Sequence, residues 1–323
     1  MKNVTSRIEP DTSVDGALKT FDRSLPAKFR EQLVAAAESG WWRDVLDDEQ
    51  LLIALRGSYL NVYWKGQSIF KVEAGASAPK ATTHEKYLLD PKLSRQVRFD
   101  GMTFDTDQLK KKAFLSEYGE GSLSRMKRAA ELYSGEEKTG CHWVALANPT
   151  VIDVEVAFPG AVEKGESGEE VTAPRIDLLA LEASGEDQAR LVFWEAKAFK
   201  NPELGSAQSK LSAPVLAQIA AYRSILETFR LDVERSYTQL CRDICAIREA
   251  AGTKLHPLIH DVAEGRRTIT LGETPQVNLL VFGFDGSQKD HPRWKTHKKA
   301  LTESLAAQGS RLRAVGDPKG AKL

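Results

Sequence analysis

The segment 189–199 (ARLVFWEAKAF) constrains the fold more than any other part of this chain. A nearly continuous apolar run of this length is typical of a strand that is buried in a sheet. Glu195 and Lys197 interrupt the run, and a buried charge is costly unless it is paired or used. Because residues two apart in a strand point the same way, we expect both charges to lie on one face.

The segments around this strand predict a mixed sheet with helices packed on it. Alternating or apolar patterns indicate strands, whereas apolar stripes at helical spacing indicate helices. The order of elements is typical of an α/β (mixed-sheet α+β) fold. We expect strands at 150–158, 175–183 and 189–199, a helix at 212–230, a second helix ending near 251, a strand at 276–286, a helix at 293–309 and an edge strand at 311–315.

The N-terminal third predicts a separate α+β domain. A helix is expected at 26–40, with Gly40 as its stop, and a β-hairpin at 59–73 turning at Lys65 and Gly66. Residues 75–105 are expected to hold loops. We therefore divide the chain into an N-terminal accessory domain at 1–105, which serves substrate or partner binding, and a second domain at 106–323.

Composition excludes several classes of protein. The formal net charge of the 323 residues is zero, which argues against non-specific coating of nucleic acid or membranes. Neither an N-terminal signal sequence nor an apolar run of about 20 residues is present, so no membrane partner is expected. Three cysteines make no disulfide framework or zinc motif, and Cys241 and Cys245 are expected to be core or half-core residues of a helix. These features predict a cytoplasmic, reduced protein.

Asp177 and Glu195 are expected to approach each other. Their strands are joined by the short turn 184–188 and should therefore be antiparallel neighbours. Two close carboxylates repel unless a hard divalent cation such as Mg²⁺ lies between them. Lys197 beside such an ion can activate water and neutralise charge on a phosphoryl group. The pattern therefore predicts metal-assisted hydrolysis of a phosphodiester.

The acid-x-Lys pattern alone is weak evidence, because it recurs in polar stretches that we interpret as turns. These other occurrences are Asp90–Lys92, Glu136–Lys138 and Asp317–Lys319. Only Glu195–Lys197 lies in an apolar strand and precedes a long amphipathic helix. That helix carries Gln218 and Tyr222, which are four residues apart and share one face.

Taken together, Arg175-Ile-Asp177, Glu195-Ala-Lys197 and Gln218-Ile-Ala-Ala-Tyr222 resemble the PD-(D/E)XK nuclease superfamily. The Gln-x-x-x-Tyr helix is similar to that of its RecB-like branch, which includes lambda-exonuclease-type enzymes. The resemblance covers roughly residues 140–285. It implies a restriction-endonuclease-like αβββαβ core and Mg²⁺- or Mn²⁺-dependent cleavage of nucleic acid, most often DNA. Such domains often serve restriction, repair or phage defence.

The resemblance also implies roles for individual residues. Asp177 and Glu195 match the two metal-binding acids, Lys197 matches the catalytic lysine, and the carbonyl of Ala196 is an expected extra metal ligand. Gln218 and Tyr222 match the helix motif. Ile176 stands where the family often has proline. The iron–sulfur subgroup needs four cysteines, so no cluster is expected here.

The upstream acid of the family stays ambiguous. Glu155 is our choice as a further metal ligand, Asp153 is predicted on the same strand face, and Glu131 on the preceding helix is the competitor. The pair His256 and His260 lacks a third ligand, so no metal is expected there.

Contacts to the nucleic-acid backbone are expected from basic helices. A homodimer or a partner subunit is plausible, and two alternatives to an enzyme remain. One is a catalytically inactive nuclease fold that binds nucleic acid or protein. The other is an interaction protein that docks through its N-terminal domain, whose Tyr59, Tyr63 and Trp64 either stack on bases or pack as a core. The basic residues are Lys110 to Lys112, Arg125, Lys127, Arg128, Arg293, Lys295, Lys298 and Lys299.

Overall fold

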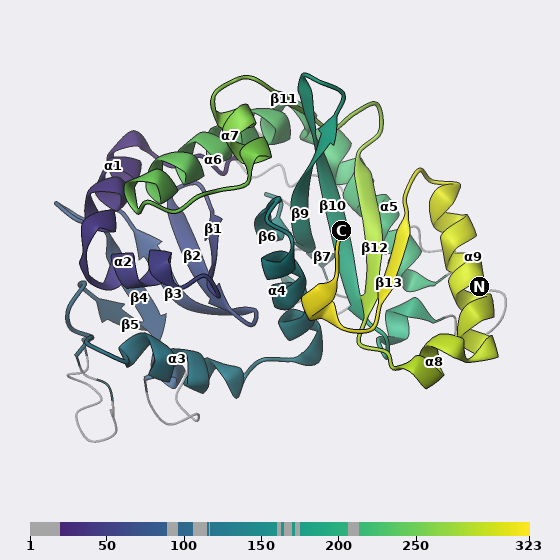
Figure 1. Cartoon of the computed structure of the whole chain (residues 1–323), viewed down its shortest axis with the longest axis horizontal. Coiled ribbons are helices and arrows are strands. Elements are labelled where there is room, and N and C mark those ends of the chain that lie inside the picture. Colours follow the sequence, from purple (N-terminus) through teal and green to yellow (C-terminus); the bar gives the residue numbers. More distant parts are fainter. Residues whose placement is uncertain are drawn as a thin grey trace.

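The computed structural model describes residues 20–88, 96–105, 115, 117–159, 163–164, 170–171, 175–205 and 213–323. Two main sheets lie beside each other, with α4 between them and α6 running along the top (Figure 1). The described chain is therefore mixed α and β, as the sequence predicted. A third, minor sheet pairs β7 (Glu163–Lys164) with β8 (Glu170–Val171).

The first sheet is antiparallel and follows the order of the chain. It consists of β1 (Leu52–Leu55), β2 (Tyr59–Trp64), β3 (Gln67–Glu73), β4 (Lys80–His84) and β5 (Gln96–Phe99). The predicted hairpin turns at Lys65 and Gly66, whose φ angles of 46° and 75° suit a two-residue type I′ turn. β4 and β5 contradict the expectation of loops at 75–105. Both strands are short and polar, so neither presents the apolar run that marks a strand in sequence.

Three helices belong with this sheet: α1 (Ala27–Ala35), α2 (Gly40–Asp47) and α3 (Ser122–Glu131). The single helix expected at 26–40 is in fact α1 followed by a 3₁₀ turn (Ala36–Glu38). Gly40 was expected to end a helix, but it begins the second one, α2. Gly40 has a φ of 78°, which a residue with a Cβ adopts only at a cost. The bend lets α2 bury Trp41 and Trp42 in the core.

The second sheet carries the candidate site. Its strand order is β13-β12-β10-β9-β6, with β11 paired to the start of β10. β10 runs antiparallel to β9 and parallel to β12, and residues 191–198 of β10 are buried, as predicted. The strands are β6 (Val151–Ala157), β9 (Arg175–Ser184), β10 (Gln188–Ala198), β11 (Thr268–Thr270), β12 (Gln276–Phe282) and β13 (Leu312–Val315).

Six helices accompany this sheet: α4 (Glu136–Ala147), α5 (Pro214–Thr228), α6 (Arg230–Ala250), α7 (Pro257–Ala263), α8 (Gly286–Asp290) and α9 (Pro292–Ala306). Short 3₁₀ turns lie at Glu85–Tyr87, Pro202–Leu204 and Pro318–Gly320. Proline begins α5, α7 and α9, where its missing N–H removes no helical hydrogen bond. Within the described ranges, every helix is too short or too polar to cross a membrane.

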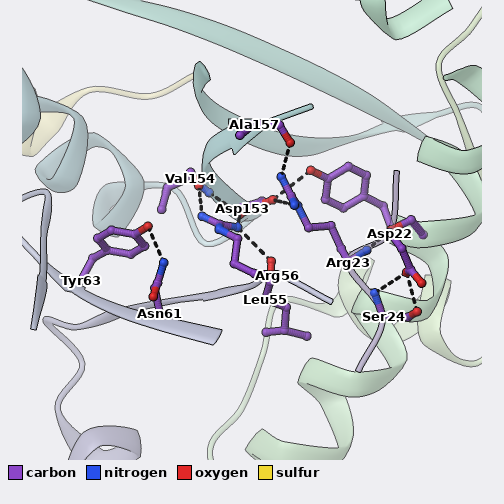
Figure 2. Close-up of polar contacts among 12 residues, drawn as sticks. Asp22, Arg23, Ser24, Leu55, Arg56, Asn61, Tyr63, Asp153, Val154 and Ala157 are labelled. Carbon is purple, nitrogen blue, oxygen red and sulfur yellow. Dashed lines mark hydrogen bonds and ion pairs between the residues drawn. The ribbon is translucent and has the colours of Figure 1, made fainter. Parts of the chain in front are cut away.

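A buried charged cluster joins the two sheets around Asp153 of β6 (Figure 2). Arg23 Nε lies 3.2 Å and Arg56 Nη1 lies 2.6 Å from the Asp153 carboxylate. The Tyr237 hydroxyl of α6 donates to the same carboxylate at 2.9 Å. One carboxylate thus connects the N-terminal segment, the end of β1 and α6. The predicted domain boundary near residue 105 stays a prediction, and α3, beyond it, packs against β2 and β3.

Gly140 allows α4 to approach β12 closely. A Cβ at this position would overlap the buried ring of Phe282. We expect Gly140→Ala to lower the free energy of unfolding by about 1–3 kcal/mol, because overpacking outweighs the gain in helix propensity. Urea denaturation measures this difference. Gly135→Ala is the control, since open space surrounds that position, and it should cost at most about 1 kcal/mol. A Gly140→Ala protein as stable as wild type would contradict the close approach.

Candidate metal and phosphodiester site

Glu195 and Lys197 lie side by side near the C-terminal end of β10. Lys197 Nζ is 2.8 Å from Glu195 Oε1, so the two side chains share one face as predicted. Lys197 Nζ is also 2.5 Å from Glu203 Oε2, in the 3₁₀ turn that follows β10. Glu195 and Lys197 are both buried, whereas the Glu203 side chain is 46% exposed. The two charges of the strand are therefore paired with each other, and the ammonium group reaches toward solvent through Glu203.

Glu155 and Asp177 stand at the same level as Glu195 in the sheet. The β9–β10 pairing ends with Leu178 opposite Trp194, so the next positions outward are Asp177 and Glu195. The β6–β9 register likewise places Glu155 opposite Asp177. Three adjacent strands thus bring three acids, 22 and 18 residues apart in sequence, into one row.

Glu137, in the first turn of α4, is a fourth acid near the end of β10 that sequence analysis missed. Its Oε2 accepts hydrogen bonds from the Ala198 N–H at 3.0 Å and from Asn201 Nδ2 at 2.8 Å. The stretch 136–138 was interpreted as a turn, and this interpretation is wrong because the stretch opens a helix. Glu136 and Glu137 in a first turn complement the helix dipole, which is the signal that could have revealed the helix start.

Gln218 and Tyr222 meet on one face of α5, as their spacing predicted. Gln218 Nε2 donates to the Tyr222 hydroxyl at 2.9 Å. That hydroxyl donates to the carbonyl of Arg175, at the start of β9, also at 2.9 Å. Tyr222 is buried, whereas Gln218 is partly exposed. The pair therefore fixes α5 to the strand that carries Asp177. The side-chain amide oxygen of Gln218 accepts no hydrogen bond among the described contacts.

Burial changes the proton affinity of the acidic pair. Burial, aided by repulsion from Glu195, raises the pKa of Asp177 well above its usual value. Burial also raises the pKa of Glu195 to about 7, although the neighbouring Lys197 opposes the rise. The pKa of Lys197 is raised despite its burial, because the carboxylates of Glu195 and Glu203 stabilise the ammonium form. Two carboxyl groups in one place without a cation thus resist ionisation, while the lysine keeps its charge.

The donor set fits a hard divalent cation. Glu195 Oε2 is buried and has no hydrogen-bond donor among the described residues. Asp177 Oδ2 accepts from the Ala196 N–H at 2.8 Å, which orients that carboxylate along β10. A cavity of about 20 Å³, enough for one water molecule, is lined by Glu155 and Asp177. No three described carboxylates here have oxygens that all lie within 4.8 Å of one another. Carboxylate oxygens of this kind are the ligands that hard divalent cations prefer.

The structure separates the three candidates for the upstream acid. Glu155 lies in the row of acids and makes only long ion pairs, 3.8 Å to Lys138 and 3.6 Å to Arg175. Asp153 belongs to the buried arginine cluster of Figure 2. Glu131 pairs with Lys65 on the first sheet at 2.8 Å. Geometry thus favours Glu155, whose φ of 53° is a strained value for a residue with a side chain.

The aromatic and cysteine side chains are mostly core. Tyr63 and Trp64 are buried, which favours packing over base stacking, and Tyr59 is partly exposed. Cys241 and Cys245 are buried as expected, and Cys141 of α4 is partly buried. His256 caps α7 by accepting the N–H of Leu258.

Several of the predicted phosphate-binding cations have carboxylate partners. Lys127 pairs with Asp48 at 2.7 Å, and Lys295 pairs with Asp290 at 3.0 Å. Arg293 instead lines an open cavity of about 1010 Å³ between α9 and Phe199. Lys110 to Lys112 lie outside the described residues. Arg125, Arg128, Lys298 and Lys299 are surface residues, and Lys299 lies 3.9 Å from Glu303.

Comparisons with protein-family models, with curated proteins and with solved structures found no match.

Glu195 gives the protein a distinct pH dependence when divalent cations are absent. Its folded pKa of about 7 lies above its ordinary value of 4.5, so the folded state binds the proton more tightly. The resulting stabilisation is complete below about pH 4.5 and is lost as the pH rises through 7. Glutamine at position 195 cannot titrate, so the Glu195→Gln protein should lack this loss of stability. Between pH 5 and pH 8 we expect the free energy of unfolding of wild type to fall, relative to that of Glu195→Gln, by up to roughly 3 kcal/mol, because one pKa unit corresponds to about 1.4 kcal/mol.

Urea denaturation at both pH values in the presence of EDTA measures this difference. Glu186→Gln is the control, because Glu186 is exposed in the β9–β10 turn. This variant should leave the free energy of unfolding nearly unchanged at both pH values. The same pH dependence in wild type and Glu195→Gln would contradict the raised pKa.

Proposed function

We propose that this protein is a metal-dependent nuclease that hydrolyses phosphodiester bonds of nucleic acid, with DNA as the favoured substrate. The observation that carries the proposal is the convergence of Asp177, Glu195 and Lys197 where the start of β9 lies beside the end of β10. Two carboxylates that resist ionisation without a cation stand beside a lysine that stays charged. A purely structural ion pair would need no second, partly buried acid beside it.

The order of elements supports the same proposal. Along the chain, α4 is followed by the three antiparallel strands β6, β9 and β10, then by α5, and later by β12 parallel to β10. This order matches the αβββαβ core of restriction-endonuclease-like enzymes, with α6 and α7 inserted before β12. We propose a restriction-endonuclease-like core on this basis.

In this proposal Asp177, Glu195 and the carbonyl of Ala196 would hold Mg²⁺, or Mn²⁺ in its place, and Glu155 would bind the ion through a water molecule. The bound cation would supply a Lewis acid that withdraws charge from the scissile phosphate. Glu195 Oε2 is the atom best placed to serve as a ligand, because it is buried without a donor. Glu137 holds the backbone of β10 at Ala198 and acts by positioning the strand.

Lys197 would stabilise negative charge that develops on the phosphoryl oxygens. Its Nζ is held between Glu195 and Glu203, so the ammonium stays in place before substrate arrives. Glu203 is the more exposed partner, and phosphate oxygens can replace it. Gln218, supported by Tyr222, is placed to donate a hydrogen bond to the substrate or to the attacking water.

The open cavity that begins at Phe199 supports a polymeric substrate. Phe199, two residues beyond Lys197, packs edge-to-face on Trp294 of α9 with ring centroids 4.9 Å apart. The cavity that they border also receives Arg293 and His297. Aromatic and basic side chains together suit bases and phosphates of a nucleic-acid strand.

The direct test is a cleavage assay with linear, circular and single-stranded DNA and with RNA, with Mg²⁺ or Mn²⁺. We expect cleavage of at least one substrate, inhibition by EDTA, and loss of activity in Asp177→Asn. Absence of cleavage by a preparation that binds Mn²⁺ would instead favour an inactive nuclease fold that acts as a binding module. Cleavage that survives Asp177→Asn would contradict the assignment of the site.

A further inference from the structure

A second cluster of potential metal ligands lies on α6 and α7, away from the strands of the proposed nuclease site. It consists of Cys245, Glu249 and His260. Cys245 and Glu249 lie one turn apart near the end of α6, and His260 faces them from α7. The cluster is the only trio of potential metal ligands within the described ranges whose ligand atoms all lie within 4.8 Å of one another. No metal was expected at His260, because its pair with His256 lacked a third ligand in the sequence. The folded α6–α7 pair supplies other partners, because it brings His260 against Cys245 and Glu249.

Two of the three distances within this trio match the edges of a metal tetrahedron, and the third, between Cys245 Sγ and the Glu249 carboxylate, is within 4.8 Å. His260 Nδ1 lies 3.7 Å from Cys245 Sγ and 3.4 Å from Glu249 Oε1. Tetrahedral Zn²⁺, with bonds of about 2.3 Å to sulfur and about 2.0–2.1 Å to nitrogen and oxygen, requires edges of roughly 3.6 and 3.4 Å. A cation could therefore enter without movement of the two helices.

His260 Nδ1 cannot serve both of its neighbours equally well by hydrogen bonding. His260 Nδ1 has two polar neighbours but only one site for a proton. If Nδ1 donates to Glu249, it cannot accept from the Cys245 thiol. If it accepts from the thiol, its lone pair faces a carboxylate. A cation that binds sulfur, nitrogen and oxygen at once removes this conflict.

We propose that Cys245, Glu249 and His260 bind a borderline transition-metal ion of the Zn²⁺ class. Thiolate and imidazole ligands favour Zn²⁺ over the hard Mg²⁺ of the nuclease proposal. Cys245 is 5% exposed, whereas the side chains of His260 and Glu249 are 26% and 60% exposed, so the ion has a path from solvent and room for a water as fourth ligand. The ion would clamp the end of α6 to α7 across the loop 251–256. It lies toward the opposite end of β10 from Glu195, because α7 leads into β11, which pairs with the start of β10.

Titration of the full-length protein with Co²⁺ tests the proposal. Co²⁺ reports a bound thiolate by charge-transfer absorption, which a site made only of oxygen ligands cannot produce. The Asp177→Asn background excludes any ion at the proposed nuclease site. We expect one equivalent of thiolate-bound Co²⁺, displaced by Zn²⁺. Loss of a residue that only hydrogen-bonds to a metal ligand typically lowers metal affinity about 10–100-fold. His260 would be a ligand itself, so His260→Ala should lower the affinity for Co²⁺ by at least roughly 100-fold.

Cys241→Ala is the matched control, because this buried thiol lies one turn earlier on α6 and outside the trio. It should keep the absorption that Cys245→Ser loses. Zn²⁺ should also protect Cys245 from alkylation in the unaltered protein, a readout that does not depend on the folding of a variant. Absence of thiolate absorption in excess Co²⁺, or absorption that survives in Cys245→Ser, would overturn the proposal. Neither result depends on nuclease activity.

Discussion

Lys197→Ala is expected to lower the rate of nucleic-acid cleavage by about 10²–10⁴-fold, the range for a positioned catalytic group. The ammonium is buried and held 2.8 Å from Glu195 Oε1, whereas Lys138 and Arg175, the cations that contact the row of acids, lie against Glu155 instead. Substrate and metal binding depend mainly on other groups. We therefore expect the loss to fall on kcat rather than on KM. Single-turnover cleavage with saturating Mg²⁺ measures the chemical step directly.

Lys200→Ala is the matched control for charge. Lys200 lies three residues further along and is exposed, so its removal should change the rate by less than about threefold. A Lys197→Ala protein that cleaves at the wild-type rate would show that the lysine serves the fold and not the chemistry. Circular dichroism of both variants separates lost activity from lost structure.

Asp153→Ala is expected to lower the free energy of unfolding by about 3–5 kcal/mol, the range for breaking a buried ion pair. The substitution leaves Arg23 and Arg56 buried, 8% and 7% exposed, without their carboxylate. It also removes the acceptor of the Tyr237 hydroxyl. Because the cluster joins the two sheets, the whole described core should lose stability together (Figure 2). Urea denaturation followed by circular dichroism measures the difference.

Asp261→Ala is the control that isolates burial. Asp261 also meets two arginines, Arg266 at 2.8 Å and Arg267 at 3.6 Å, but on the surface. Exposed pairs contribute about 0–1 kcal/mol, so this variant should be nearly neutral. Equal losses in Asp153→Ala and Asp261→Ala would contradict the role of the buried cluster.

The parts of the fold that the sequence predicted are those governed by local periodicity. The apolar run of β10, the Lys65–Gly66 turn and the edge strand β13 each follow from patterns within ten residues or so. The site was predictable as far as Asp177, Glu195 and Lys197, because a two-residue period and a short turn determine which side chains face each other. Gln218 and Tyr222 follow in the same way from helical spacing.

The features that sequence analysis missed depend on contacts between distant segments. Asp153 and Arg23 are 130 residues apart, so the strand pattern alone does not show that they meet. It therefore could not distinguish Asp153, a buried partner of two arginines, from Glu155, a candidate metal ligand. Glu137 reaches the end of β10 only because Gly140 lets α4 lie close to β12. Cys245 and His260 meet only when α6 and α7 pack together. In each case tertiary packing, which no local pattern records, decides the role of a polar residue.

The central claim is that Asp177 and Glu195 hold a divalent cation beside Lys197. Crystals of the protein soaked in Mn²⁺ and measured for anomalous scattering test it most directly. We expect an anomalous peak within bonding distance of Asp177, Glu195 and the carbonyl of Ala196. If Mn²⁺ binds as Mg²⁺ would, the distances from the metal to these oxygens should be about 2.0–2.2 Å. The peak should disappear in Asp177→Asn. A wild-type crystal with no peak between these carboxylates, at Mn²⁺ concentrations that support cleavage, would contradict the account.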